Sequence, residues 1–215
     1  MEISHIGHAC FRLKGKTGTL ITDPYDPAST GLPFPKDLTA DIVTVSHSHP
    51  DHNFTSFIKG NFKTLTLPGE YEIGGISLIG VATFHDEKNG QEKGKNTCFV
   101  IEMDGLRLFH LGNLGHLLTQ EQLNEIGQVD IVFVPTGPFL TPQKAADIVK
   151  QLEPEIVIPM HYREEKTAPE LATKLYPVED FLKIMGLQAL HEARYIISRE
   201  KLPEELTVVV LDSKA

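Results

Sequence analysis

The sequence of 215 residues has little cysteine, no long apolar run and no basic tract. Its two cysteines, Cys10 and Cys98, lie far apart and outside any Cys-x-x-Cys pair, which favours free thiols in a reducing compartment over a disulfide. No stretch approaches the ~18 apolar residues of a membrane span, and no basic segment leads into an apolar one after Met1. We therefore expect a cytoplasmic protein with no membrane partner.

The charge balance is acidic, because 20 lysine and arginine residues stand against 29 aspartate and glutamate residues, for a net charge of −9. This charge disfavours attraction to a phosphate backbone, so a nucleic acid is not the expected partner. With 40% hydrophobic residues, the chain can bury a sizeable core, and it contains no repeat, low-complexity segment or linker. The sequence predicts one domain over residues 1–215 that binds a small-molecule substrate, and it leaves the oligomeric state open.

Short strand-like runs alternate with turn signals through the first half of the chain. Strands are predicted over residues 3–5, 10–13, 19–22, 42–45, 63–67 and 76–82. A hairpin is predicted from residues 98–101 and 106–109, because Asp104-Gly105 between them tolerates the positive φ angles of a tight turn. A helical turn is also predicted from Asn53 through Ile58.

Helices are predicted mainly in the second half, where they alternate with short buried strands. Thr119 and Gln122 form a capping box ahead of one helix, which Gly127 would end. Thr141-Pro142 begins another, with an apolar stripe at helical spacing. A further helix is predicted over residues 178–185, and strands over 131–134, 156–158 and 206–211. This α/β (α+β) pattern predicts two sheets packed face to face with helices outside.

Ligand-type side chains are concentrated in one segment, which reads TVSHSHPDHN. Side chains alternate in an extended segment, so His47 and His49 point to the same side and can share a metal ion. Asp51 and His52 follow at a turn, so one loop could serve two metals. Imidazole and carboxylate suit zinc, with iron or manganese as alternatives, because no thiolate is present. A polar loop with surface histidines is the alternative, but this spacing after a buried-type strand outweighs it.

More candidate ligands follow apolar strands elsewhere in the chain. His85 follows the strand that ends near residue 84, His110 and Asn113 follow residues 106–109, and His161 follows residues 156–160. One four-residue cluster cannot complete two metal sites, so further ligands must come from other segments. The recurrence of histidine at strand ends therefore indicates an assembled site.

The ordered motifs resemble those of the metallo-β-lactamase-fold hydrolases. Asp23 in LITDPY resembles the aspartate of the first motif and HSHPDH the second, while His85 in TFHD, HLGNLGH and His161 in IPMHY resemble the third to fifth. The segments IGHACFRL and IPMHY are more similar to the branch of zinc-dependent hydrolases that includes L-ascorbate-6-phosphate lactonase than to antibiotic-degrading β-lactamases. The resemblance implies a four-layer αββα sandwich of two mixed β-sheets, with the site at one edge.

The resemblance also implies how the ligands divide between metal ions. One zinc would be held by His47, His49 and His85, and a second by three other side chains: Asp51, His52 and His161. At Asn113 the family usually has a bridging aspartate, whereas a neutral amide offers only a carbonyl oxygen. Two cations would then repel each other more strongly, so one site should be weaker and the protein would hold one or two zinc ions. Asn113 is either a native amide ligand of this branch or an introduced substitution.

These residues predict a metal-dependent hydrolase. Bound metal lowers the pKa of water from ~16 to about 7, and the hydroxide would attack an ester, lactone, phosphoester or amide. Asp51 would orient the nucleophile and relay its proton to the leaving group. No Gly-x-Ser-x-Gly elbow is present to suggest a serine nucleophile. The alternatives are a phosphodiesterase or nuclease on the same fold, and a metal-binding regulatory protein that has lost turnover through Asn113.

Substrate contacts are predicted from residues that flank the ligands. His8, in the GHACF stretch, either faces the metals, binds substrate or is hydrogen-bonded near the sheet edge. The polar segment of residues 85–96 would form either a pocket wall or a solvated hairpin. Its lysines could meet an anionic substrate: Lys88, Lys93 and Lys95. Tyr162 is a further candidate, and Asp23 is expected to orient a metal-ligating imidazole.

Overall fold

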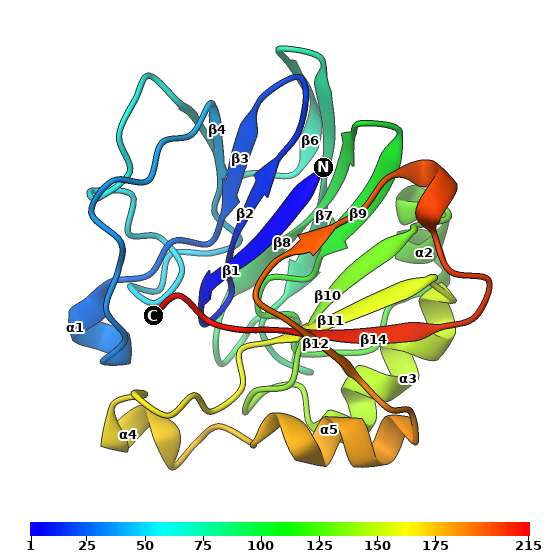
Figure 1. Cartoon of the computed structure of the whole chain (residues 1–215). Coiled ribbons are helices and arrows are strands. Elements are labelled where there is room, and N and C mark those ends of the chain that lie inside the picture. The colour runs from blue at the N-terminus through cyan, green and yellow to red at the C-terminus, as the bar shows by residue number, and fades with distance from the viewer.

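A computed structural model describes residues 1–215 as two β-sheets packed face to face (Figure 1). The first sheet contains β1 (Glu2–Gly7), β2 (Cys10–Lys14), β3 (Thr19–Thr22), β4 (Ile42–Thr44), β5 (Lys63–Leu65) and β13 (Tyr195–Ile196). The second contains β6 (Gly69–Ile73), β7 (Ile76–Phe84), β8 (Lys95–Met103), β9 (Leu106–His110), β10 (Ile131–Pro135), β11 (Ile156–Met160), β12 (Leu190–Glu192) and β14 (Thr207–Leu211). Their orders are β13-β1-β2-β3-β4-β5 and β12-β14-β11-β10-β9-β8-β7-β6. Each sheet contains both parallel and antiparallel pairs, so both are mixed, as predicted.

Five α-helices and one 3₁₀-helix complete the secondary structure. They are α1 (Pro27–Thr30), α2 (Gln120–Ile126), α3 (Pro142–Leu152), α4 (Pro169–Ala172), α5 (Val178–Met185) and the 3₁₀-helix η1 (Arg199–Lys201). The capping box of Thr119 and Gln122 is present at α2, and Gly127 ends that helix with φ 66°. Thr141 caps α3. These caps and helices confirm the predictions for the second half of the chain. None of the helices combines the length and the apolar character needed to cross a membrane.

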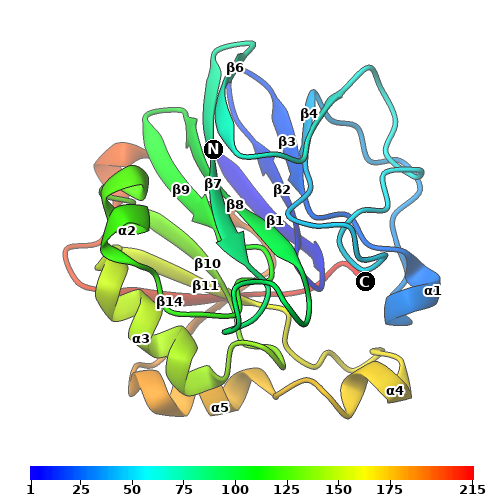
Figure 2. The same cartoon turned by 180° about the vertical axis from the view of Figure 1, so that it is seen from behind.

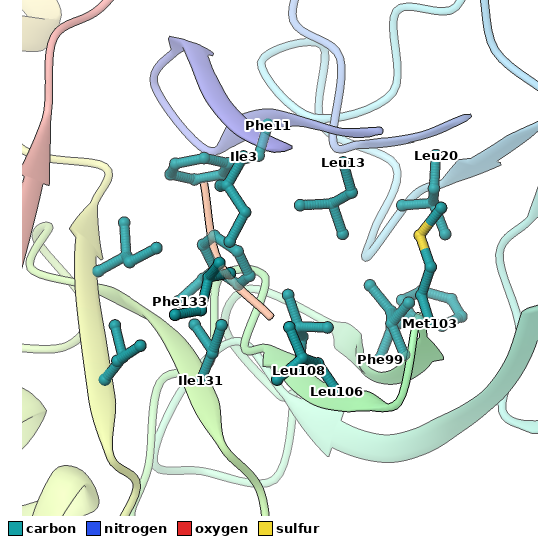
Figure 3. Close-up of a cluster of buried hydrophobic side chains, with 14 of the residues drawn as sticks. Ile3, Phe11, Leu13, Leu20, Phe99, Met103, Leu106, Leu108, Ile131 and Phe133 are labelled. Carbon is teal, nitrogen blue, oxygen red and sulfur yellow. The ribbon is translucent and has the colours of Figure 1, made fainter. Parts of the chain in front are cut away.

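The main core lies between the two sheets (Figure 3). Ile3, Phe11 and Leu13 from the first sheet face Leu108 and Phe133 from the second, and all five are completely or almost completely buried. In β8, alternate residues face this core. Cys98 and Val100, which lie between those residues in the strand, point to the other face of the sheet and belong to a second hydrophobic cluster there. Both faces of the second sheet are therefore buried, which explains why its central strands are continuous apolar runs.

The outer faces of the two sheets are covered differently. Helix α2 packs against β7, α3 packs against β10, and α5 packs against α3, so helices cover the second sheet (Figure 2). On the outer face of the first sheet, a third hydrophobic cluster includes Leu32, Phe34 and Ile58. Leu32 and Phe34 come from irregular chain after the short α1, and Ile58 comes from irregular chain between β4 and β5. The prediction of helices outside holds for the second sheet, whereas irregular chain forms most of the layer over the first.

Two sets of local predictions are wrong. The predicted helical turn from Asn53 through Ile58 is a series of turns, in which the Ile58 amide donates to the Thr55 carbonyl, three residues back, at 3.0 Å. Strands β6, β12 and β13 were not predicted. They are short or largely exposed edge segments, so they lack the buried apolar alternation on which strand prediction depends. The predicted β8–β9 hairpin is confirmed, with φ 54° at Asp104 and 77° at Gly105.

Candidate metal centre

The candidate ligands all follow the carboxyl ends of strands. In chain order these are His8 after β1, Asp23 after β3, residues 47–52 after β4, His85 after β7, Asn113 after β9 and His161 after β11. Strands β3 and β4 are parallel, as are β9, β10 and β11, so their carboxyl ends meet at common sheet edges. The loops after these strands therefore converge at one edge of the sandwich, as the sequence predicts.

The first cluster consists of His47, His49 and His85. Their ligand atoms lie within 4.8 Å of one another, and the ring centroids are 4.6 to 5.1 Å apart. Nε2 of His47 and both ring nitrogens of His85 are buried and have no hydrogen-bond partner. Three imidazoles therefore face a common point, and nitrogen atoms that protein groups leave unpaired are available to a ligand.

The second cluster consists of His8, Asp51, His52 and His161, again with ligand atoms within 4.8 Å of one another. Oδ2 of Asp51 lies 3.2 Å from Nε2 of His8, 3.7 Å from Nε2 of His52 and 4.0 Å from Nε2 of His161. The rings of His47 and His52 are 4.3 Å apart, so the two clusters are neighbours. The structure thus separates the candidates into the two sets implied by the family resemblance, and it adds His8 to the second.

Asp23 orients one histidine in each cluster. Its Oδ2 accepts hydrogen bonds from Nδ1 of His52 at 2.8 Å and from Oγ of Ser46 at 2.6 Å. Because the Ser46 hydroxyl gives its proton to Asp23, its oxygen accepts the Nδ1 proton of His47 at 2.9 Å. The Nε2 lone pairs of both histidines then point away from Asp23. These hydrogen bonds are the ones that the predicted orienting role of Asp23 requires, and Ser46 extends them to the first cluster.

The electrostatics keep these imidazoles neutral and Asp51 ionised. Burial lowers the pKa of His52 to about 3 and that of His85 to about 4, and it also lowers the pKa values of His47 and His161. For Asp51, burial raises the pKa, but the surrounding imidazoles, His52 first, outweigh burial and bring the pKa below its usual range. At neutral pH the clusters therefore present nitrogen lone pairs and one carboxylate, which are the forms that bind metal.

These residues fit a divalent metal ion. A tetrahedral zinc with bonds of about 2.0–2.1 Å holds its ligand atoms about 3.4 Å apart. The 3.2 to 4.0 Å around Oδ2 of Asp51 bracket that spacing. Both nitrogens of His161 are buried without a partner, like those of His85. The donor types and the unpaired buried nitrogens agree with a zinc-type site in each cluster.

Two glycines and an asparagine support the site but were not predicted to do so. A Cβ atom at Gly137 would lie 2.3 Å from Nδ1 of His161, so only glycine leaves room for that ring. A Cβ at Gly115 would lie 2.3 Å from the His85 carbonyl oxygen. The side chain of Asn96 accepts a hydrogen bond from the backbone amide of Asn113 at 2.9 Å and donates one to the Leu111 carbonyl at 3.0 Å. An asparagine within an apolar strand and the repeated glycines of HLGNLGH were the available signals.

Asn113 lies beside the second cluster, where its Nδ2 is 3.5 Å from Nε2 of His52. His110, which also follows β9, is instead a structural residue. Its Nε2 donates to the Ala9 carbonyl at 3.0 Å, and its Nδ1 accepts from the Gly112 amide at 3.2 Å. Of the two candidates from this strand end, only Asn113 can contact a cluster ligand.

The loop from residue 86 to 94 is ordered by Asp86. Its carboxylate accepts hydrogen bonds from the backbone amides of Lys88, Gly90, Glu92 and Lys93. Lys88 pairs with Glu92, and Nζ of Lys93 lies 5.2 Å from the Phe139 ring, which packs edge-on against His85 at 4.5 Å. Lys95 is exposed, with no side-chain hydrogen bond or ion pair, at the start of β8. Among these lysines, Lys93 is connected to the first cluster through Phe139, and Lys95 is free.

Tyr162 lies away from the position expected of a substrate contact. Its ring lies 6.1 Å from that of His5 and lines a pocket of about 300 Å³ that contains none of the cluster residues. The preceding residue, His161, has φ 56°, which turns the chain so that neighbouring side chains diverge. The position of Tyr162 does not support its predicted role in substrate binding.

Known proteins are similar to this chain in sequence and in fold. A model of the beta-lactamase superfamily domain matches residues 2–161. A UPF0173 metal-dependent hydrolase of Thermococcus onnurineus is 30% identical in an alignment that covers 88% of this chain and 94% of that protein. A UPF0173 metal-dependent hydrolase from Thermococcus kodakarensis is 27% identical, and the alignment again covers 88% of this chain and 94% of that protein. A crystal structure from Thermotoga maritima, of a protein assigned as a zinc-dependent hydrolase of the metallo-beta-lactamase superfamily, has a TM-score of 0.80, 36% identity and 99% coverage of both chains.

The chain is therefore a member of the beta-lactamase superfamily, with the two-sheet fold of the metallo-β-lactamases. Within that superfamily it belongs to the UPF0173 metal-dependent hydrolase family. The family resemblance read from the motifs is confirmed at this level, whereas the narrower similarity to the lactonase branch stays a prediction.

Proposed function

We propose that the protein is a zinc-dependent hydrolase that cleaves an ester, lactone or phosphoester of a small molecule. The observation that carries the proposal is the convergence of six imidazoles and one carboxylate in two adjacent clusters, with unpaired nitrogens in each. The relatives from both Thermococcus species are described as metal-dependent hydrolases, and the Thermotoga maritima protein as zinc-dependent. Manganese and iron are the alternative metals for these ligands.

The two clusters would hold one metal ion each. In the first, His47, His49 and His85 supply three nitrogen donors. In the second, Asp51, His52 and His161 supply two nitrogens and a carboxylate oxygen, and Asn113 can turn its carbonyl oxygen toward His52. When bound, a divalent ion supplies Lewis acidity, which lowers the pKa of water toward neutrality and polarises the scissile group.

Asp51 is the residue best placed to handle the proton of the attacking water. Its side chain is 22% exposed, while those of His8, His52 and His161 are at most 2% exposed, so Asp51 is the member of the second cluster that solvent reaches. Its pKa lies below the usual range, so it is ionised at neutral pH and can accept a hydrogen bond from a water molecule and orient it. Of the three ring nitrogens near Oδ2 of Asp51, Nε2 of His8 is the nearest, at 3.2 Å.

A pocket of about 370 Å³ reaches His47 and supports a substrate that carries hydroxyl groups. Apart from Val45 and His47, its lining consists of neutral hydrogen-bonding side chains: Ser48, Asn53, Thr55, Thr64 and Thr66. No lysine or arginine is part of this lining, so an anionic group of the substrate would have to meet Lys95 outside it. A hydroxylated lactone or ester fits this lining, in agreement with the lactonase resemblance. The buried free thiols of Cys10 and Cys98 support a cytoplasmic location.

Metal reconstitution tests this function. Metal-free protein would be assayed against lactones, carboxylic esters and phosphodiesters after addition of zinc, manganese or iron. We expect zinc to restore hydrolysis of a lactone or ester, and His47→Ala to remove it. His191→Ala, which changes an exposed histidine of β12, is the matched control and should retain activity.

Other outcomes of this assay would support one of the two alternative functions. Turnover of phosphodiesters alone would favour a phosphodiesterase or nuclease. Tight metal binding without turnover of any substrate would favour a metal-binding regulatory protein. Failure of the parent protein to bind any of the three metals would overturn the proposal.

A further inference from the structure

His8 lies among the candidate ligands of the second cluster, although it precedes the ligand-rich segment by about forty residues of sequence. Its ring centroid is 3.9 Å from that of His161 and 5.2 Å from that of His52, and its Nε2 is 3.2 Å from Oδ2 of Asp51. The residue is 1% exposed. Its imidazole is therefore enclosed by the other three members and is almost inaccessible to solvent.

The backbone of His8 is held in an uncommon conformation by contacts from separate segments. Its φ of 56° lies in the left-handed region, which a residue with a side chain rarely adopts. The His8 amide donates to Oε1 of Glu164 at 2.6 Å, and its carbonyl oxygen accepts from the His161 amide at 3.0 Å and from Nε2 of His5 at 3.1 Å. Strain that the surroundings maintain in this way is typical of residues with a fixed functional geometry.

The composition of the second cluster shows why a fixed position of the His8 imidazole matters for metal binding. Because Asn113 is neutral and its Nδ2 faces His52, this sequence supplies no bridging carboxylate there. Asp51, His52 and His161 alone would leave a metal ion with three protein donors, whereas closed tetrahedral sites have four. Nε2 of His8 is the additional donor atom at ligand spacing. The first cluster has no fourth member, so it keeps an open coordination position.

We infer that His8 is the fourth protein ligand of the metal ion in the second cluster, which makes that site closed and tighter, while the first cluster keeps the position open to substrate. This inference rests on the proposed function, because it concerns the same metal centre. It assigns His8 to the metal and not to the substrate, and it assigns Glu164 a positioning role through the His8 amide.

Cobalt binding gives a direct readout of ligand number. Metal-free parent, His8→Gln and His8→Ala would be titrated with Co²⁺, whose visible absorption is strong in four-coordinate sites and weak when water molecules raise the coordination number. Zinc affinity would be measured in parallel by competition with a chromophoric chelator. We expect both variants to lose most of the strong absorption of the tighter site and to bind zinc there at least about tenfold more weakly, since even loss of an outer partner of a ligand costs that much.

Controls separate the possible failures. His191→Ala should match the parent in both titrations, and Glu164→Gln should weaken the tighter site less than His8→Gln does. Circular dichroism of the metal-free proteins establishes that each variant is folded, and His8→Gln keeps a polar side chain of similar length in case His8→Ala does not fold. An unchanged cobalt spectrum and zinc affinity in folded His8→Gln would overturn the inference, even if turnover is lost, because His8 would then act on substrate. A parent protein that binds no metal would instead refute the proposed function.

Discussion

The two clusters of the candidate metal centre each contain three imidazoles but differ in charge and number of ligands. The first contains three imidazoles and no carboxylate, and the second contains three imidazoles with Asp51. A carboxylate attracts a divalent cation in this largely buried setting far more than a fourth neutral group would. We therefore expect the two ions of the proposed centre to be held unequally, one for binding strength and one for access to substrate.

The clusters also differ in how the fold supports them. The second depends on left-handed backbone at His8 and His161, each with φ 56°, and on the space left by Gly137. The first depends on the bends at residues 47–49 after β4 and on His85, beside the loop that Asp86 orders. The left-handed backbone is therefore concentrated in the second cluster, whereas each cluster is closely packed against a glycine, so small changes in volume should affect both.

Removal of one ligand from each cluster is the strongest test of the difference. We expect His47→Ala and His161→Ala both to abolish turnover while the fold is retained, because each side chain lies on a loop at the sheet edge and leaves both cores intact. His161→Ala should release the tightly held ion, whereas His47→Ala should release the weaker one. Zinc content after dialysis against a weak chelator distinguishes them, and equal zinc content in both variants and the parent would contradict the ligand assignment.

A change in volume without loss of a ligand should have the next largest effect. Gly137→Ala places a methyl group 2.3 Å from Nδ1 of His161, and Gly115→Ala places one 2.3 Å from the His85 carbonyl oxygen. Overpacking of this kind costs about 1–3 kcal/mol of unfolding free energy. We expect Gly137→Ala to weaken zinc binding at the second cluster and Gly115→Ala to weaken it at the first. Urea denaturation and zinc titration measure both effects, and identical zinc affinities in the two variants would show that the clusters do not depend on these glycines separately.

Addition of a carboxylate at Asn113 should make the two sites more alike. Asn113→Asp keeps nearly the same shape and adds one negative charge beside His52, whose ring is 4.3 Å from that of His47. Because this carboxylate would lie where the two clusters meet, we expect the weaker site to bind zinc about tenfold or more tightly and turnover to rise. Asn124→Asp, at an exposed position of α2, adds the same charge outside the centre and should change neither. If the site is instead adapted to the amide, Asn113→Asp will reduce turnover. Equal zinc affinity of parent and variant at both sites would show that the missing carboxylate is not limiting.

Acid should destabilise the metal-free protein more than the zinc-loaded one, and we expect this to be the smallest of the four effects. The folded pKa values of about 3 for His52 and about 4 for His85 lie below the unfolded value of about 6.5. As pH falls below about 6.5, the unfolded chain therefore binds protons before the folded chain does, and the free energy of unfolding declines toward pH 4. Bound zinc competes with those protons and should move the decline to lower pH. Melting temperatures at pH 7.5 and 5.0, with and without zinc, test this, and parallel pH profiles would contradict it.

The predictable parts of the protein were those that depend on local spacing. The caps at Thr119 and Thr141 determine their helices because a side-chain oxygen satisfies free amides within one turn. The His-x-His-x-Asp-His segment indicated a metal site because that density of ligands after a buried strand has few structural explanations. The helical turn expected after Asn53 is wrong, because this segment forms turns and is joined to a distant part of the chain by the hydrogen bond from the Phe54 amide to the Pro24 carbonyl.

The sequence alone determined which chemistry this protein can perform, since residue types and their positions at strand ends specify imidazole and carboxylate ligands and the strands that carry them. Only the tertiary structure showed which of these side chains lie together and that His8 is among them. His8 precedes β2 and His161 follows β11, yet a backbone hydrogen bond between them and a left-handed turn at each bring both rings to Asp51. That grouping depends on how two sheets pack and where their strand ends meet, which is a property of contacts between distant segments and is not encoded in any local pattern.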